Sequence, residues 1–265
     1  MNSKGCGAHR SSQHIHTVNV FAKFALGQVE REHDTMPFVA GQCALVGKPV
    51  APVSEFTGGD DAGNSHELLH DVHERLHPID ALQFAKDVEP YKLFFLEDVL
   101  APEDIGWFKT IRQQSATPLA MGELFNNPHE WRGLITEHLI DFVRTHISQI
   151  GGITPARNLA IFAGTFGVRT AWHGPGDTSP VGHAANLHLD VWAPNFGIQE
   201  WYQPSKLEYE MFPGLPQVRK GYLYPNDNPG LGIDIDEQLA ARYPCEEIVE
   251  KWTQTRLPDG SPARP

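Results

Sequence analysis

The sequence predicts an α/β fold in which parallel strands are joined by helices, from about residue 66 to about residue 200. Three observations lead to this prediction. Short apolar segments alternate with helical patterns, prolines stand near the expected helix starts, and acidic residues follow successive apolar segments at equal spacing. Doubly wound sheets and β/α barrels both show such alternation, so the polar residues at the strand ends must separate them.

The expected elements follow one another regularly along this stretch. LLHDVHERL (68–76) holds the first strand, KLFFLE (92–97) is a buried strand, and residues 103–114 place Ile105, Phe108 and Ile111 at helical spacing. Further strand and helix pairs are expected at 118–123 and 128–138, at 140–145 and 154–167, and at 168–173 and 179–190, and a strand at 196–201 ends the series. Pro128, Pro155 and Pro180 lie near helix starts, where a missing N–H costs least.

Composition narrows the classes of protein. The 265 residues are 40% hydrophobic, which is enough for a substantial core, and the formal charge of −12 without a Lys/Arg run argues against a nucleic-acid partner. Cys6, Cys43 and Cys245 are widely separated, so they fit neither a disulfide scaffold nor a zinc cluster. No apolar run approaches a membrane span, and we expect a cytoplasmic protein with no membrane partner.

Three carboxylates follow successive strands at one fixed interval. Glu97 comes 26 residues after Asp71, and Glu123 comes 26 residues after Glu97. This spacing predicts equivalent positions on three neighbouring parallel strands, at the end that is the catalytic face in a barrel. Clustered carboxylates repel one another unless a cation lies among them, and all-oxygen ligands favour Mg²⁺. The alternative is that each acid is a helix cap or a solvated charge, which three acids in register make less favoured.

Other polar residues at the strand ends are candidates for the same site. In a strand, residues i and i+2 share a face, so His73 is expected beside Asp71, where an imidazole can exchange a proton near neutral pH. Arg144 can hold a carboxylate through two hydrogen bonds. Later strand ends add His173, Asp177 and Glu200. Taken alone, His173 is as consistent with a structural role as with a functional one, and the glycines of HGPGD are also consistent with a simple turn.

The chain resembles a known family over roughly residues 65 to 260. The segments that carry the resemblance are LLHDVHERL, LFFLED, PLAMGE, DFVRTHISQIGGIT, AWHGPGDTSP, PNFGIQE and GYLYPNDNPGLGIDID. They are similar to the mannonate dehydratase group of the enolase superfamily, which belongs to the mandelate racemase/muconate lactonizing enzyme relatives and includes D-gluconate and galactonate dehydratases and starvation-sensing proteins. The resemblance implies the barrel domain of this superfamily, a (β/α)8 TIM-type barrel.

The resemblance also implies a chemistry. It assigns Asp71, Glu97 and Glu123 as Mg²⁺ ligands, His73 as the acid/base histidine, and Arg144, His173, Asp177 and Glu200 as substrate contacts. The implied reaction is loss of water from a sugar acid to give a 2-keto-3-deoxy acid. Members of the family commonly assemble, so a homo-oligomer is compatible with the sequence.

The N-terminal part departs from the family. Members carry a capping domain and two barrel units before the strand of the first ligand, whereas residues 1–64 form an atypical segment that we expect to be partly disordered. Only two isolated strands are expected there, within residues 18–26 and 42–47. We therefore expect residues 65–265 to form an incomplete barrel domain, with the capping domain and first units missing or divergent.

The same departure bears on activity. The family removes the substrate proton with a tyrosine from the missing region, and the first tyrosine of this chain is Tyr91. Two functions stay open: a weak magnesium-dependent sugar acid dehydratase, in which His173 is the nearest substitute base, and an inactive remnant that binds Mg²⁺ or a sugar acid.

Overall fold

The computed structural model describes residues 15–19, 42–46, 68–219 and 222–244. Its centre is a five-stranded parallel sheet with the strands in chain order: β3 (His70–Asp71), β4 (Leu96–Glu97), β5 (Leu119–Met121), β6 (Phe142–Val143) and β7 (Arg169–Thr170). A parallel bridge between Thr170 and Phe196 connects β7 to the segment that leads into β8 (Ile198–Glu200). The predicted α/β architecture of parallel strands is confirmed.

Two N-terminal strands pair antiparallel with each other, and the second also pairs with β8. β1 (Ile15–Asn19) pairs with β2 (Gln42–Val46), and β2 pairs with β8, both antiparallel. The second strand agrees with the one expected at residues 42–47, whereas the first begins three residues earlier than predicted. Most of residues 1–64 lie outside the described ranges, so the proposed domain boundary and the disorder there stay predictions, as does the pairing state of Cys6 and Cys245.

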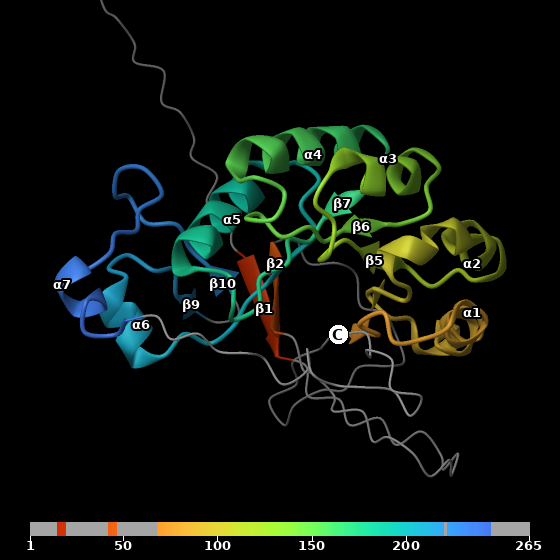
Figure 1. Cartoon of the computed structure of the whole chain (residues 1–265), viewed down its shortest axis with the longest axis horizontal. Coiled ribbons are helices and arrows are strands. Elements are labelled where there is room, and N and C mark those ends of the chain that lie inside the picture. Colours follow the sequence, from red (N-terminus) through yellow and green to blue (C-terminus); the bar gives the residue numbers. More distant parts are fainter. Residues whose placement is uncertain (1–14, 20–41, 47–67, 220–221, 245–265) are drawn as a thin grey trace, which may run out of the picture.

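Helices follow the strands and lie outside them. Figure 1 shows α1 to α4 as an outer arc around the parallel strands, with α6 and α7 far from α1 and α2. The helices are α1 (Pro78–Asp87), α2 (Phe108–Gln114), α3 (Pro128–Thr136), α4 (Ile153–Thr165), α5 (Pro180–Trp192), α6 (Lys206–Met211) and α7 (Glu237–Ala240). Two 3-10 helices are also present, η1 (Glu89–Tyr91) and η2 (Pro102–Trp107). A small antiparallel pair is formed by β9 (Val218–Arg219) and β10 (Tyr222–Leu223).

The helix starts show why the sequence signals were informative. Pro128 and Pro180 are the first residues of α3 and α5, and Pro155 is the third residue of α4. Asn127 caps α3 in a reciprocal capping box with Glu130, which satisfies backbone N–H groups that the helix leaves free. Local capping chemistry therefore accounts for the starts of α3 and α5, where a capping side chain precedes a proline.

Alternate strand residues pack on opposite faces of the sheet. Leu96, Met121 and Val143 belong to the large core between the strands and the helices. The residues on the inner face form a separate cluster: Phe95, Ala120, Phe142, Ala171 and Ile198, with Leu69 and Phe94 against it. This two-sided burial is the arrangement of a barrel wall, in which helices cover the outside and side chains fill the inside.

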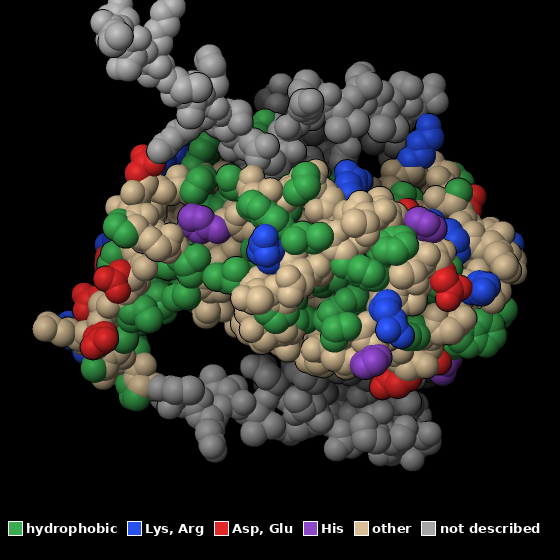
Figure 2. All heavy atoms as spheres, turned by 90° about the horizontal axis from the view of Figure 1, so that it is seen from above, with side chains coloured by type: hydrophobic (Ala, Val, Ile, Leu, Met, Phe, Trp, Pro, Cys, Tyr) green, Lys and Arg blue, Asp and Glu red, His purple; other side chains and the backbone are tan. Residues whose placement is uncertain are grey.

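The outer surface is mixed in character. In Figure 2, hydrophobic side chains are scattered among charged and polar ones on the face seen from above. Ile153, Ile161 and Trp192 are among the exposed apolar residues, and the Trp192 ring is covered by the Arg157 guanidinium at 5.3 Å. Within the described ranges, no helix is both long enough and apolar enough to cross a bilayer.

Candidate functional site

The inner face of the barrel wall leads directly to the candidate site. Residues i and i+2 of a strand point to the same side, and five predicted site residues each stand two positions after a residue packed in the inner cluster. The pairs are Leu69 and Asp71, Phe95 and Glu97, Phe142 and Arg144, Ala171 and His173, and Ile198 and Glu200. The apolar interior thus ends in a polar layer at the carboxyl ends of the strands.

The register supports the equal-spacing argument for two of the three acids. Asp71 pairs with Glu97 across β3 and β4, as predicted. Glu97, however, pairs with Ala120 and not with Glu123, so the expectation of an equivalent position is wrong for the third carboxylate. Glu123 lies two residues beyond the end of β5, after Gly122, whose φ of 140° turns the chain. It reaches the site from a loop, where its carboxylate lies 3.5 Å from His73 and 3.2 Å from His173.

His73 lies beside Asp71, but not for the reason that the strand pattern suggests. The strand ends at Asp71, and His73 has a left-handed φ of 55°. Its backbone N–H donates to Asp71 Oδ1 at 2.7 Å, and its ring Nδ1 lies 3.2 Å from Asp71 Oδ2. The hydrogen bond with Asp71 and the charge of Glu123 raise the pKa of His73 to about 9, against the effect of burial. The ring is therefore protonated at neutral pH in this arrangement.

Arg144 is buried and pairs with two acids of the site. Its Nε donates to Glu97, and its Nη2 donates to Glu200 at 2.7 Å, while Nη1 donates to the carbonyl of Ala171 at 3.2 Å. Burial would raise the pKa of Glu200, but Arg144 and His173 outweigh it and hold that pKa below its usual range. Arg144 thus joins Glu97 and Glu200 within the layer, and contact with a substrate carboxylate stays a prediction.

The remaining two predicted residues differ in their placement. His173 joins the layer, with Nε2 3.2 Å from Glu123 and 3.9 Å from Glu200. Asp177 is solvent-exposed in the loop before α5 and makes none of these ion pairs. The structure therefore brings together seven of the eight predicted residues through shared contacts or strand register, and leaves Asp177 at the rim.

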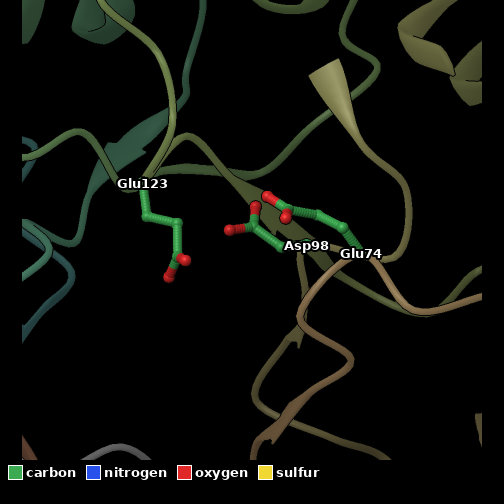
Figure 3. Close-up of side chains that lie close together, drawn as sticks. All are labelled: Glu74, Asp98 and Glu123. Atoms are coloured by element: carbon green, nitrogen blue, oxygen red, sulfur yellow. The ribbon is translucent and has the colours of Figure 1, made fainter. Parts of the chain in front are cut away.

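Two buried acids of the site were missed. The ligand atoms of Glu74, Asp98 and Glu123 all lie within 4.8 Å of one another, and in the part of the chain that is described they form the one such group (Figure 3). Figure 3 shows the carboxylates of Glu74 and Asp98 facing each other, with Glu123 approaching from a separate loop. Asp98 directly follows Glu97 and Glu74 directly follows His73, so a search of every acid after each strand would have found both.

His146 is a further residue that the sequence analysis passed over. It is buried, its ring packs at 5.5 Å from the His173 ring, and its Nε2 lies 2.9 Å from Thr178 Oγ1. Ser148 N–H donates to its Nδ1, so Nε2 carries the proton and Thr178 accepts it. The signal was present, because His146 stands two residues after Arg144.

The site holds more carboxyl groups than its cations can pair with. Six carboxyl groups lie in or beside the polar layer, Asp71, Glu74, Glu97, Asp98, Glu123 and Glu200, and Arg144 is the buried guanidinium among them. Burial, together with Glu123, raises the pKa of Glu74 to about 7 and that of Asp98 well above its usual value. One Asp98 oxygen also lacks a hydrogen-bond partner. Buried, crowded carboxyl groups whose pKa values are raised by burial and by one another fit a hard divalent cation such as Mg²⁺, whose charge would favour their ionised forms.

The fold and this site define the class of protein. The chain belongs to the enolase C-terminal domain-like family, whose model matches residues 53–239. The expected superfamily resemblance and the barrel-type fold are confirmed.

Individual relatives make the resemblance more specific. The chain is 57% identical to a D-galactonate dehydratase family member of Musicola paradisiaca over 75% of this chain and 48% of that protein. It is 59% identical to the family member RspA of Pantoea ananatis over 77% of this chain and 49% of that protein. The chain therefore spans about half the length of the relatives it matches.

Solved structures agree with this assignment. An enolase from Pantoea ananatis, crystallised with bound D-gluconate and magnesium, is similar with a TM-score of 0.74 and 59% identity, over 77% of this chain and 49% of that one. A mandelate racemase/muconate lactonizing enzyme from Jannaschia sp. CCS1 is similar with a TM-score of 0.65 and 26% identity, over 71% of this chain and 47% of that one.

Proposed function

We propose that this chain carries the metal-binding and proton-donating part of a magnesium-dependent sugar acid dehydratase, acting on a D-gluconate- or D-mannonate-type acid. The observation that carries the proposal is the buried layer of carboxylates at the strand ends, joined to Arg144, His73 and His173. The relatives support the sugar acid class, because they are D-galactonate dehydratase family members and one similar structure holds D-gluconate and magnesium.

Asp71, Glu97 and Glu123 are the proposed Mg²⁺ ligands. When bound, the cation supplies positive charge beside the substrate carboxylate and stabilises negative charge that develops during proton removal. The close group of Glu74, Asp98 and Glu123 is a second candidate ligand set, which shares Glu123 and is favoured by its tight spacing. The two sets differ at two positions, Asp71 against Glu74 and Glu97 against Asp98. Glu97 and Asp98 are neighbours in the chain and can be exchanged separately.

Each residue has a definite part in the proposed dehydration. The α C–H bond breaks as a base takes its proton, the β C–O bond breaks, and the hydroxyl leaves as water with a proton from His73. The resulting enol rearranges to the 2-keto-3-deoxy acid. His173 is the proposed substitute base, since its ring lies in the polar layer and contacts Glu123, which also contacts His73. Arg144, Asp177 and Glu200 are proposed substrate contacts.

The alternative is that the chain binds Mg²⁺ or a sugar acid without turning the acid over. The absence of tyrosine from residues 1–90 favours this alternative, because the tyrosine base that the resemblance implies has no counterpart there. Both proposals share the metal site and differ in the fate of the bound acid.

Calorimetric titration of the metal-free chain with Mg²⁺ tests the ligand set. We expect Glu97→Gln to abolish the binding heat, because an amide removes a charged ligand, and Asp98→Asn to weaken binding by no more than the ~10- to 100-fold typical of groups outside the ligand set. Glu137→Gln is the matched control, since Glu137 is an exposed acid paired with Lys109 and should leave binding unchanged. Loss of binding in Asp98→Asn with retention in Glu97→Gln would assign the metal to the second set.

Turnover distinguishes the dehydratase from the binding protein. With excess Mg²⁺ and D-gluconate or D-mannonate, we expect 2-keto-3-deoxygluconate to form more slowly than with the Pantoea ananatis relative, by about 10²- to 10⁴-fold, the usual contribution of a placed general base. The product is measured as its semicarbazone. A rate equal to that of the relative, and lost in His173→Asn, would contradict the slow rate and establish His173 as an effective base.

A further inference from the structure

His183 is a buried histidine that the proposed chemistry does not use. It lies in the first turn of α5 with 1% of its surface exposed, and its ring stacks on Tyr202 at 4.8 Å and meets Trp201 edge-on at 4.9 Å. Its ring Nε2 lies 3.2 Å from the carbonyl oxygen of Pro175. A carbonyl can only accept, so Nε2 carries the proton and the ring is held in one tautomer. Its other nitrogen, Nδ1, has no hydrogen-bond partner.

Pro175 is the centre of the HGPGD loop, which carries His173 at one end and Asp177 at the other. The loop is anchored on both sides of this proline. On one side the Gly174 N–H donates to Glu200 at 2.8 Å, and on the other the Thr178 N–H donates to the Pro175 carbonyl at 3.1 Å. The Pro175 carbonyl therefore receives two hydrogen bonds, and the one from His183 ties the loop to α5.

The contact between loop and helix is tight. A Cβ added at Gly174 would lie 2.6 Å from the Glu200 carbonyl oxygen and 3.1 Å from His183 Cε1, so glycine is what permits this approach. His183 thus sits beneath the loop, and the aromatic rings of Trp201 and Tyr202 fix its plane. The ring contacts and the hydrogen bond to Pro175 couple the position of the His183 ring to that of the loop.

We infer that His183 is a positioning residue, which through its hydrogen bond to Pro175 holds the loop of His173 and Asp177 in place for binding a sugar acid. The binding part of this inference rests on the proposed function, whereas the positioning of the loop does not. His183 touches neither the proposed metal ligands nor the substrate contacts through its ring nitrogens, so its effect on the acid should pass through the loop.

Two matched substitutions test the role of the donated proton. His183→Gln keeps an N–H donor at a similar reach, whereas His183→Phe keeps an aromatic ring against Trp201 and Tyr202 but cannot donate. Hydrogen exchange of the Gly174 and Thr178 amides should be about two- to tenfold faster in His183→Phe, the range expected for one lost hydrogen bond, and near wild type in His183→Gln. Equal exchange in all three proteins, or equal acceleration in both variants, would overturn the inference.

Ligand titration separates this inference from the proposed function. With Mg²⁺ present, D-gluconate affinity should fall about two- to tenfold in His183→Phe and stay near wild type in His183→Gln, while the affinity for Mg²⁺ alone stays unchanged in both. A wild-type chain that binds no D-gluconate would contradict the proposed function and the binding part of the inference. The hydrogen-exchange result would still test whether His183 holds the loop in place. If His183→Phe does not fold, ¹⁵N NMR of the wild type serves instead: a slowly exchanging Nε2 proton is expected, and a ring protonated on Nδ1 alone would overturn the inference.

Discussion

Replacing Arg144 with leucine is expected to lower the free energy of unfolding by about 3–5 kcal/mol, because Glu97, which is buried, and Glu200, which is largely buried, lose their partner. Arg144 is 2% exposed and donates to both Glu97 and Glu200. Urea unfolding of the metal-free protein measures the change. Lys109→Leu is the control, since the Lys109–Glu137 pair is exposed on both sides and should contribute no more than about 1 kcal/mol.

The loss of stability in Arg144→Leu should become smaller as the pH falls. Burial opposes ionisation of Glu200, but Arg144 and His173 outweigh it and lower its pKa, so this acid stabilises the fold above its unfolded pKa and loses that contribution as the pH falls. The deficit of Arg144→Leu should therefore be largest at neutral pH and shrink in acid. Adding Glu97→Gln and Glu200→Gln to the variant should recover part of the loss, because the charges left unpaired are then removed. A loss of less than about 1 kcal/mol at neutral pH would show that other groups stabilise Glu97 and Glu200 in place of Arg144.

Truncating Phe142 to alanine is the second change with a large expected effect, a loss of about 3–5 kcal/mol, since it opens a cavity inside the barrel wall. Phe142 is 1% exposed, and its ring lies 5.0 Å from Phe94 and 5.1 Å from Phe95. The Arg169 guanidinium also covers it at 4.2 Å. The same urea measurement applies.

A surface residue provides the comparison for Phe142. Ile161 on α4 is 47% exposed, and its replacement by alanine should change stability by no more than about 0.5 kcal/mol. If Phe142→Ala cost as little as Ile161→Ala, the inner cluster would not be a packed core, and the polar layer above it would lose its proposed support.

Part of the candidate site followed from spacing and part did not. Asp71 and Glu97 were placed as neighbours by the 26-residue interval, and the strand register agrees. The same interval misled for Glu123, because Glu97 pairs with Ala120, and Glu123 lies beyond the end of β5, after the turn at Gly122. His73 was expected near Asp71 by strand alternation, whereas a left-handed turn brings it there. Equal spacing therefore identified the right end of the sheet without determining how each side chain reaches it.

The sequence by itself determined the elements and the end of the sheet at which polar residues collect. Apolar periodicity and capping residues such as Asn127 act over a few residues, so the strand and helix order could be derived from local physics. Only the tertiary structure decided which charges meet: Arg144 with Glu97 and Glu200 across 47 and 56 residues of sequence, and Glu74 with Asp98 and Glu123. It also decided that β2 pairs antiparallel with β8. These outcomes depend on pairing between distant segments and on burial that desolvates their charges, and no local pattern encodes either of them.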